Sequence, residues 1–208
     1  MPVPSWSALF DLHMEKLLAG LDREAFFRRY GWVEDYARKA GELLSPASLA
    51  AMPPEKIYAA LDSLNVPKCR VYMTNLGRMN QAAEVVAGIT ALLSEPGDFA
   101  EKYRAGKIPQ AGKATLSQIL CLTRPHRFAI RNTPFTRALA KQTPFYSAKA
   151  LEELGYEEFL DLCRELARIA EKRLKPLGLA EWAEKHRFLL LYALLIHRQG
   201  QPGRPAGN

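Results

Sequence analysis

Cysteine is scarce in this sequence of 208 residues, and long apolar runs are missing. The three cysteines, Cys69, Cys121 and Cys163, are odd in number and far apart, which argues against a disulfide framework or a cysteine metal site. The longest strongly apolar run, Phe188 to Ile196, is about half of the roughly 20 residues that a membrane crossing needs. No basic segment followed by an apolar stretch opens the chain, so no signal peptide is expected. These absences favour a cytoplasmic protein that does not span a membrane.

Acidic residues are absent from one long stretch of the chain. No aspartate or glutamate occurs from Lys102 to Leu151, and residues 101–149, here called the basic segment, hold ten basic residues against the single acid Glu101. The whole chain has a formal net charge of +7, so the net charge of +9 in the basic segment accounts for all of the excess. Solvated surfaces usually mix both signs, and a surface of one sign indicates a polyanionic partner such as the phosphates of a nucleic acid. The alternative is a basic face that pairs with acids elsewhere in the chain.

Signatures of catalysis and of cofactors are also missing. The four histidines form no His-x-x-x-His pattern and no Cys-x-x-Cys pair occurs, so we expect no metal site. No Gly-x-x-x-x-Gly-Lys-Ser/Thr loop is present for a nucleotide-driven motor, and no Gly-x-Ser-x-Gly elbow for a serine hydrolase. The sequence therefore predicts a binding module without a cofactor rather than an enzyme.

The apolar residues recur at helical spacing along most of the chain, which predicts an all-α fold. We expect residues 1–198 to form a single multi-helix domain. Residues 199–208 contain several glycines and prolines and no apolar anchor, and we expect them to form a flexible tail or linker. Only Val66 to Met73 has the composition of a short strand.

Three long helices can be placed from their apolar residues. A core helix is expected over residues 74–93, and two closing helices over residues 156–174 and 179–197. Pro176-Leu177-Gly178 separates the closing helices, because proline ends one helix and glycine allows the chain to turn before the next.

The basic segment contains one recognisable local motif. Asp98-Phe99-Ala100-Glu101 has the spacing of a capping box that starts a helix, and Gly106 suits the left-handed position that ends one. Residues 107–115 then lead into a second apolar helix, so the layout is helix, tight turn, helix. The backbone N–H groups of Gly112, Lys113 and Ala114 at the start of that helix are expected to form an anion site, to which Lys113 adds a full charge. Such an element binds DNA phosphates without reading sequence.

The turn of this motif, Ile108-Pro109-Gln110-Ala111-Gly112-Lys113-Ala114, resembles the Leu-Pro-Gly-Val-Gly-x-Ala hairpin of helix-hairpin-helix DNA repair proteins. Gly112 and Ala114 match, whereas Gln110 stands where the first glycine is usual. In glycosylases of that superfamily a short extended piece with a catalytic aspartate follows after one helix. The equivalent residues 128–133 contain no carboxylate. A glycosylase-like repair enzyme is therefore an alternative that this stretch disfavours.

A longer pattern is similar to segments of bacterial McrB-like restriction proteins. It runs from residue 99 to residue 139, about a fifth of the chain, and rests on residues 99–103, the hairpin, residues 120–128 and residues 132–139. The resemblance implies an N-terminal DNA-binding domain that a linker joins to a GTP-hydrolysing AAA+ motor, which acts with a nuclease subunit. It also implies two open alternatives for the target, bulk duplex phosphates or a modified base such as a methylated one. A helical protein-interaction scaffold is a further alternative, in which the basic side chains pair with acids of residues 1–100 and 150–208.

The candidate DNA contacts are the turn and the basic side chains that follow it. Among them, Arg131 and Asn132 have the side chains that suit guanine and adenine edges in the major groove. Aromatic residues of the same segment are candidates for stacking on unpaired bases, namely Tyr103, Phe128, Phe135, Phe145 and Tyr146. The complete set of predicted DNA-binding residues is Lys107, Gly112, Lys113, Arg124, Arg127, Arg131, Asn132, Arg137 and Lys141.

Overall fold

The computed structural model describes residues 5–65, 81–94, 97–106, 108, 111–142 and 146–196. Thirteen α-helices and two short 3-10 helices make up all of the regular structure in these residues, and no strand occurs among them. The predicted all-α fold is therefore confirmed. The predicted strand over 66–73 and the predicted tail over 199–208 lie outside the described residues. In the described part of the chain, no helix combines the length and the apolar character that a membrane crossing requires.

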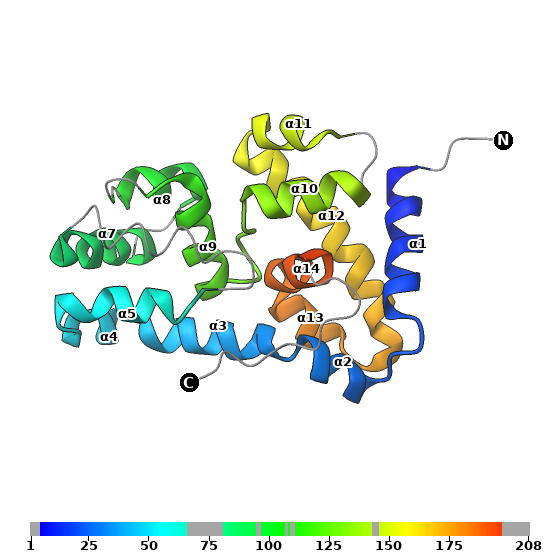
Figure 1. Cartoon of the computed structure of the whole chain (residues 1–208), viewed down its shortest axis with the longest axis horizontal. Coiled ribbons are helices and arrows are strands. Elements are labelled where there is room, and N and C mark those ends of the chain that lie inside the picture. Colours follow the sequence, from blue (N-terminus) through cyan, green and yellow to red (C-terminus); the bar gives the residue numbers. More distant parts are fainter. Residues whose placement is uncertain are drawn as a thin grey trace. The chain divides into compact units, whose positions relative to one another are not determined.

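The chain divides into two compact units. Unit 1 comprises residues 1–34 and 132–208, and unit 2 comprises residues 35–131, which Figure 1 draws from light blue to green. The basic segment contributes to both units, because the boundary between them falls after Arg131. That residues 1–198 act as a single DNA-binding module stays a prediction.

Unit 1 is built around the long helix α12, Tyr156–Leu174, which has the bounds predicted from the sequence. Helix α12 packs against α1, α13 and α14, and α14 also packs against α10 and α2. After Leu174, Gly178 adopts a left-handed conformation with φ of 68°, as the stop signal predicts. The other elements of unit 1 are α1 (Trp6–Leu18), α2 (Arg23–Tyr30), the start of α3 (Trp32–Leu43), α10 (Thr133–Gln142), α11 (Ala148–Glu153), η2 (Lys175–Leu177), α13 (Ala180–Lys185) and α14 (Arg187–Ile196).

The second closing helix is interrupted, which corrects the prediction of one continuous helix over residues 179–197. Helix α13 ends at Lys185 and α14 begins at Arg187, because His186 has φ of −109° and ψ of 15°. The buried ring of His186 lies against Trp182, and its Nδ1 lies 2.9 Å from the carbonyl oxygen of Trp182. No proline or glycine marks this break, so the sequence carried no local signal for it.

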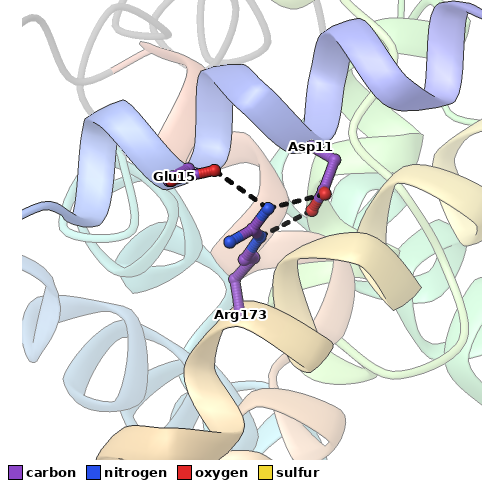
Figure 2. Close-up of polar contacts among 3 residues, drawn as sticks. All are labelled: Asp11, Glu15 and Arg173. Carbon is purple, nitrogen blue, oxygen red and sulfur yellow. Dashed lines mark hydrogen bonds and ion pairs between the residues drawn. The ribbon is translucent and has the colours of Figure 1, made fainter.

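One arginine and two carboxylates join α1 to α12, the longest helix of unit 1. Arg173 of α12 donates from Nε and Nη2 to the two carboxylate oxygens of Asp11 in α1, at 2.6 Å each. Its Nη2 also donates to Glu15 at 3.1 Å, one turn further along α1 (Figure 2). The hydrogen bond and the charge of Arg173 hold the pKa of Asp11 below its usual value, against a smaller opposing effect of burial. The forked geometry fixes the position of α1 along α12.

The stability of unit 1 is expected to fall in mild acid because of His186. Burial lowers the pKa of His186 below its ordinary value of 6.5, and the hydrogen bond to Trp182 and the charge of Glu34 only partly oppose this. His186 therefore binds a proton more readily in the unfolded chain than in the folded one. The free energy of unfolding has its full value above pH 6.5 and declines as the pH falls through the lowered pKa. Urea unfolding followed between pH 7.5 and pH 5 should show a smaller decline in His186→Phe than in the unchanged chain. Replacement of the exposed His126 by alanine should leave the decline as it is; equal declines in all three would contradict the role of His186.

Unit 2 is organised by α7, Ala82–Ser94, which packs against α4, α5, η1 and α8. Helix α7 forms the second part of the core helix predicted over 74–93, and the first part lies outside the described residues. Residues 115–122 of α9 are all buried. The elements of unit 2 besides α7 and the rest of α3 are α4 (Pro46–Ala51), η1 (Pro54–Lys56), α5 (Ile57–Asp62), α8 (Phe99–Ala105) and α9 (Lys113–Thr123).

Candidate nucleic-acid interface

Helices α8 and α9 lie on either side of the predicted turn in unit 2. The capping box at the start of α8 is confirmed: Asp98 accepts a hydrogen bond from the backbone of Glu101 at 2.9 Å, and Glu101 accepts one from the backbone of Asp98 at 3.0 Å. Lys107, Pro109 and Gln110 of the turn lie outside the described residues, so its likeness to a helix-hairpin-helix turn stays a prediction.

Gly106 ends α8 as predicted, but its predicted left-handed conformation is wrong. Its φ is −67°, within the right-handed helical region that any residue adopts. The packing around it is close, since a Cβ atom at this position would lie 3.2 Å from Leu92 Cδ1 and 3.2 Å from the carbonyl oxygen of Lys102. Close packing against α7, and not backbone conformation, therefore favours a small residue at position 106.

The start of α9 has the geometry expected of an anion site. Gly112 is the exposed N-cap residue and has no side chain to accept hydrogen bonds from the first turn. The first bond of the helix runs from Leu116 N–H to the Gly112 carbonyl, so the N–H groups of Lys113, Ala114 and Thr115 have no acceptor within the helix. Space around Gly112 is open, because a Cβ atom there would meet nothing within 4 Å, and Lys113 is exposed. Thr115 is buried, so the helix dipole, the N–H groups of Lys113 and Ala114 and one ammonium group favour an anion at the same place.

A hollow of about 460 Å³ lies beside this helix start. It is mostly apolar, and among the described residues that line it Tyr103 and Arg104 of α8 have polar side-chain groups. Among the aromatic residues considered for base stacking, Phe128 and Phe135 are buried, whereas Tyr103 and Tyr146 are partly exposed. Phe145 lies outside the described residues. The described residues that line the hollow are Tyr103, Arg104, Ile108, Ala111 and Leu116.

Lys102 and Arg124 of the basic segment turn inward to the last turn of α7, and Arg127 contacts the chain that follows this helix. Lys102 is fully buried, and its Nζ donates to the carbonyl oxygen of Leu92 at 3.0 Å. Arg124 donates to the carbonyl oxygen of Leu93, and Arg127 donates to that of Gly97 at 2.7 Å. Carbonyls at a helix C-terminus lack partners and carry partial negative charge, so cations are stabilised there. The structure thus gives Arg124 and Arg127 a role in folding that the sequence did not indicate.

The two guanidinium groups at the end of α7 lie close enough to affect each other. Burial lowers the pKa of Arg124 below its ordinary value, and the charge of Arg127 lowers it further. Arg127 is exposed and lies over the ring of Phe128, with 5.2 Å from its guanidinium carbon to the ring centroid. Arg127 therefore has donors left for a ligand, whereas Arg124 is mainly held in the protein.

Arg131 and Asn132, the predicted readers of base edges, occupy constrained positions. Asn132 is 4% exposed, and its side-chain oxygen accepts a hydrogen bond from Phe135 N–H at 2.9 Å, as an N-cap of α10 does. Arg131 is half-buried, and its backbone N–H donates to Ser117 Oγ at 3.0 Å. An asparagine two residues before a proline is a helix-start signal, and this capping role could have been predicted from Asn132-Thr133-Pro134. Base contact by either side chain stays a prediction.

Arg137 and Lys141 are exposed, four residues apart on one face of α10 in unit 1. Lys107 lies outside the described residues. Lys149 pairs with Glu153 at 3.7 Å. Within the described part of the chain, however, none of the following basic residues forms an ion pair: Arg104, Lys113, Arg124, Arg127, Arg137 and Lys141. The extensive pairing with acids that a protein-interaction scaffold predicts is therefore not seen for these six residues.

No three His, Cys, Asp or Glu side chains gather as metal ligands would in the residues that the structure describes. A scan against models of protein families, a search of characterised proteins and a search of solved structures gave no match to this chain. The similarity to McrB-like restriction proteins therefore stays a prediction from the sequence.

Proposed function

We propose that this chain is a DNA-binding module that holds backbone phosphates at the start of α9. The observation that carries the proposal is the uncapped start of α9, where the exposed Gly112 has no side chain to accept hydrogen bonds from the first turn and the exposed Lys113 adds a positive charge. A phosphate oxygen bound there would receive hydrogen bonds along the positive end of the helix dipole. Arg104 is exposed at the neighbouring hollow and would contact an adjacent phosphate.

The other basic residues fall into separate classes under this proposal. In unit 1, Arg137 and Lys141 form a second exposed pair that would add phosphate contacts. Arg127 would bind phosphate through the guanidinium N–H groups that do not donate to Gly97. Arg124 would act mainly by holding the end of α7. Contacts of these kinds fix the protein on the duplex and supply affinity without sequence discrimination.

The resemblance to McrB-like proteins extends the proposal to a biological role. The chain would be the targeting module of a modification-dependent restriction system in the cytoplasm, with a GTP-hydrolysing AAA+ motor and a nuclease provided by other domains or subunits. The resemblance alone supports this role. The binding experiment compares methylated with unmethylated DNA to test for a preference.

The proposal is tested by titrating the whole chain with a fluorescent DNA duplex over about 50 to 200 mM salt, because phosphate binding weakens steeply with salt. Lys113→Ala should weaken binding several-fold and reduce the slope of log affinity against log salt by about one. Lys149→Ala is the matched control, since this ammonium group is paired with Glu153, and it should change neither quantity.

Absent or salt-independent binding by the unchanged chain would overturn the proposed function. The same titration with a methylated duplex tests the restriction role. Tighter binding of the methylated duplex would support that role. Equal affinity for the methylated and unmethylated duplexes would overturn it and leave only the binding of backbone phosphates.

A further inference from the structure

Gly88 is the place where α7 touches the connection between α8 and α9. A Cβ atom at residue 88 would lie 2.6 Å from the carbonyl oxygen of Gly106 and would also overlap the side chain of Ile108. Contacts of Cβ atoms below 3.0 Å are essentially never seen, and one of these two neighbours is backbone, which cannot rotate away. Only glycine at residue 88 therefore permits the observed approach of the connection to α7.

One turn further along α7, Leu92 makes two more contacts with the same segment. Its carbonyl oxygen accepts the hydrogen bond from buried Lys102, and its Cδ1 lies 3.2 Å from where a Cβ atom of Gly106 would be. Gly106 and Ile108 are both buried. The end of α8 and the beginning of the connection are thus held against one face of α7 by Gly88 and Leu92, four residues apart.

One backbone hydrogen bond couples Ile108 to the residue that precedes the start of α9. The N–H of Ala111 donates to the carbonyl oxygen of Ile108 at 3.0 Å, and Gly112 follows directly as the N-cap of α9. A displacement of Ile108 therefore moves the residues that precede the open N–H groups. We propose that Gly88 is a positioning residue for phosphate binding, and that it acts through Ile108 on the first turn of α9. This inference rests on the proposed function.

The test is a double-mutant cycle between Gly88→Ala and Lys113→Ala, measured as affinity for a DNA duplex at fixed salt. Gly88→Ala should weaken binding by about tenfold, although residue 88 lies within α7 and not in the turn. In that background Lys113→Ala should cost less than about twofold, because the displaced turn no longer places Lys113 at a phosphate. Gly41→Ala is the matched control, since it is the same substitution inside helix α3 with nothing within 4 Å of the new methyl group. It should leave affinity unchanged.

A second variant covers the case in which Gly88→Ala does not fold. Ile108→Val removes only Cδ1, one of the atoms nearest Gly88, and such substitutions are usually tolerated in cores. It should weaken binding about threefold, and Lys113→Ala should again cost less in its background than in the unchanged chain. Circular dichroism would confirm that each variant is folded under the binding conditions.

The outcomes separate the inference from the proposed function. If the unchanged chain binds DNA and the effects of Lys113→Ala and the two positioning variants simply add, the positioning role is overturned and the phosphate site stands. If Gly88→Ala folds and binds like the unchanged chain, the positioning role is likewise overturned. If the unchanged chain does not bind DNA at all, the proposed function fails and the inference falls with it.

Discussion

We expect Lys102→Ala to lower the free energy of unfolding of unit 2 by about 3 kcal/mol. The side chain of Lys102 is fully buried, so its removal leaves a cavity next to α7. The substitution also removes the hydrogen bond that its ammonium group donates to the carbonyl oxygen of Leu92 at 3.0 Å. That carbonyl belongs to the last turn of α7, where carbonyl groups have no partner within the helix. The loss would be measured by urea unfolding followed by circular dichroism, which reports on both units.

Lys102→Met separates the two causes of this loss. Methionine fills most of the same volume without a charge, so this variant should lose less than the alanine variant and retain a measurable deficit from the unpaired Leu92 carbonyl. Lys113→Ala is the control for lysine removal, because Lys113 is exposed, and it should change stability little. A methionine variant more stable than the unchanged chain would show that the buried ammonium group costs more than its hydrogen bond returns.

We expect Glu171→Ala to destabilise unit 1 by about 3 kcal/mol, because it leaves a largely buried guanidinium group without its main partner. Arg187 donates from Nε to Glu171 at 2.6 Å and from Nη2 at 3.3 Å, and the two side chains are only 20% and 19% exposed. Glu184 is also near Arg187, at 3.7 Å, but it is 71% exposed and compensates little. The three tryptophans of the chain, Trp6, Trp32 and Trp182, all belong to unit 1, so fluorescence during urea unfolding reports on this unit.

Two further variants define the origin of this effect. Glu165→Ala lies on the same helix at an exposed position and should cost little. Arg187→Met combined with Glu171→Ala should recover part of the loss, because the stranded charge is then removed as well. An unchanged unfolding midpoint in Glu171→Ala would contradict a structural role for this ion pair.

Features of the fold that depend on neighbours in sequence were predictable. The capping box of Asp98 and Glu101, the start of α9 after Gly112, and the bounds of α12 all follow from residues within one or two turns of each other. The same holds for Gly178, whose left-handed conformation ends the segment after α12. Local chemistry decides these features whatever the rest of the chain does.

Features that depend on tertiary packing were not predictable. Counting charge along the sequence treats every lysine and arginine as a surface residue, yet Lys102 and Arg124 are directed at backbone carbonyls of α7, 10 and 31 residues away in sequence. The close packing at Gly106 is another case, because it comes from the side chain of Leu92 and not from the turn itself. The break at His186 also has no sequence signal, since it accompanies the burial of that ring against Trp182.

The division of the chain has a consequence for the order of events during synthesis. Unit 2 is continuous in sequence and is complete once residue 131 has been made, whereas unit 1 consists of residues 1–34 and 132–208. A nascent chain that has not reached α12 contains α1 without Arg173, so Asp11 and Glu15 lack this partner until residue 173 has been made. Since domains fold as units on the ribosome, the inserted unit can fold first. Helix α1, although synthesised before unit 2, is then expected to dock after it.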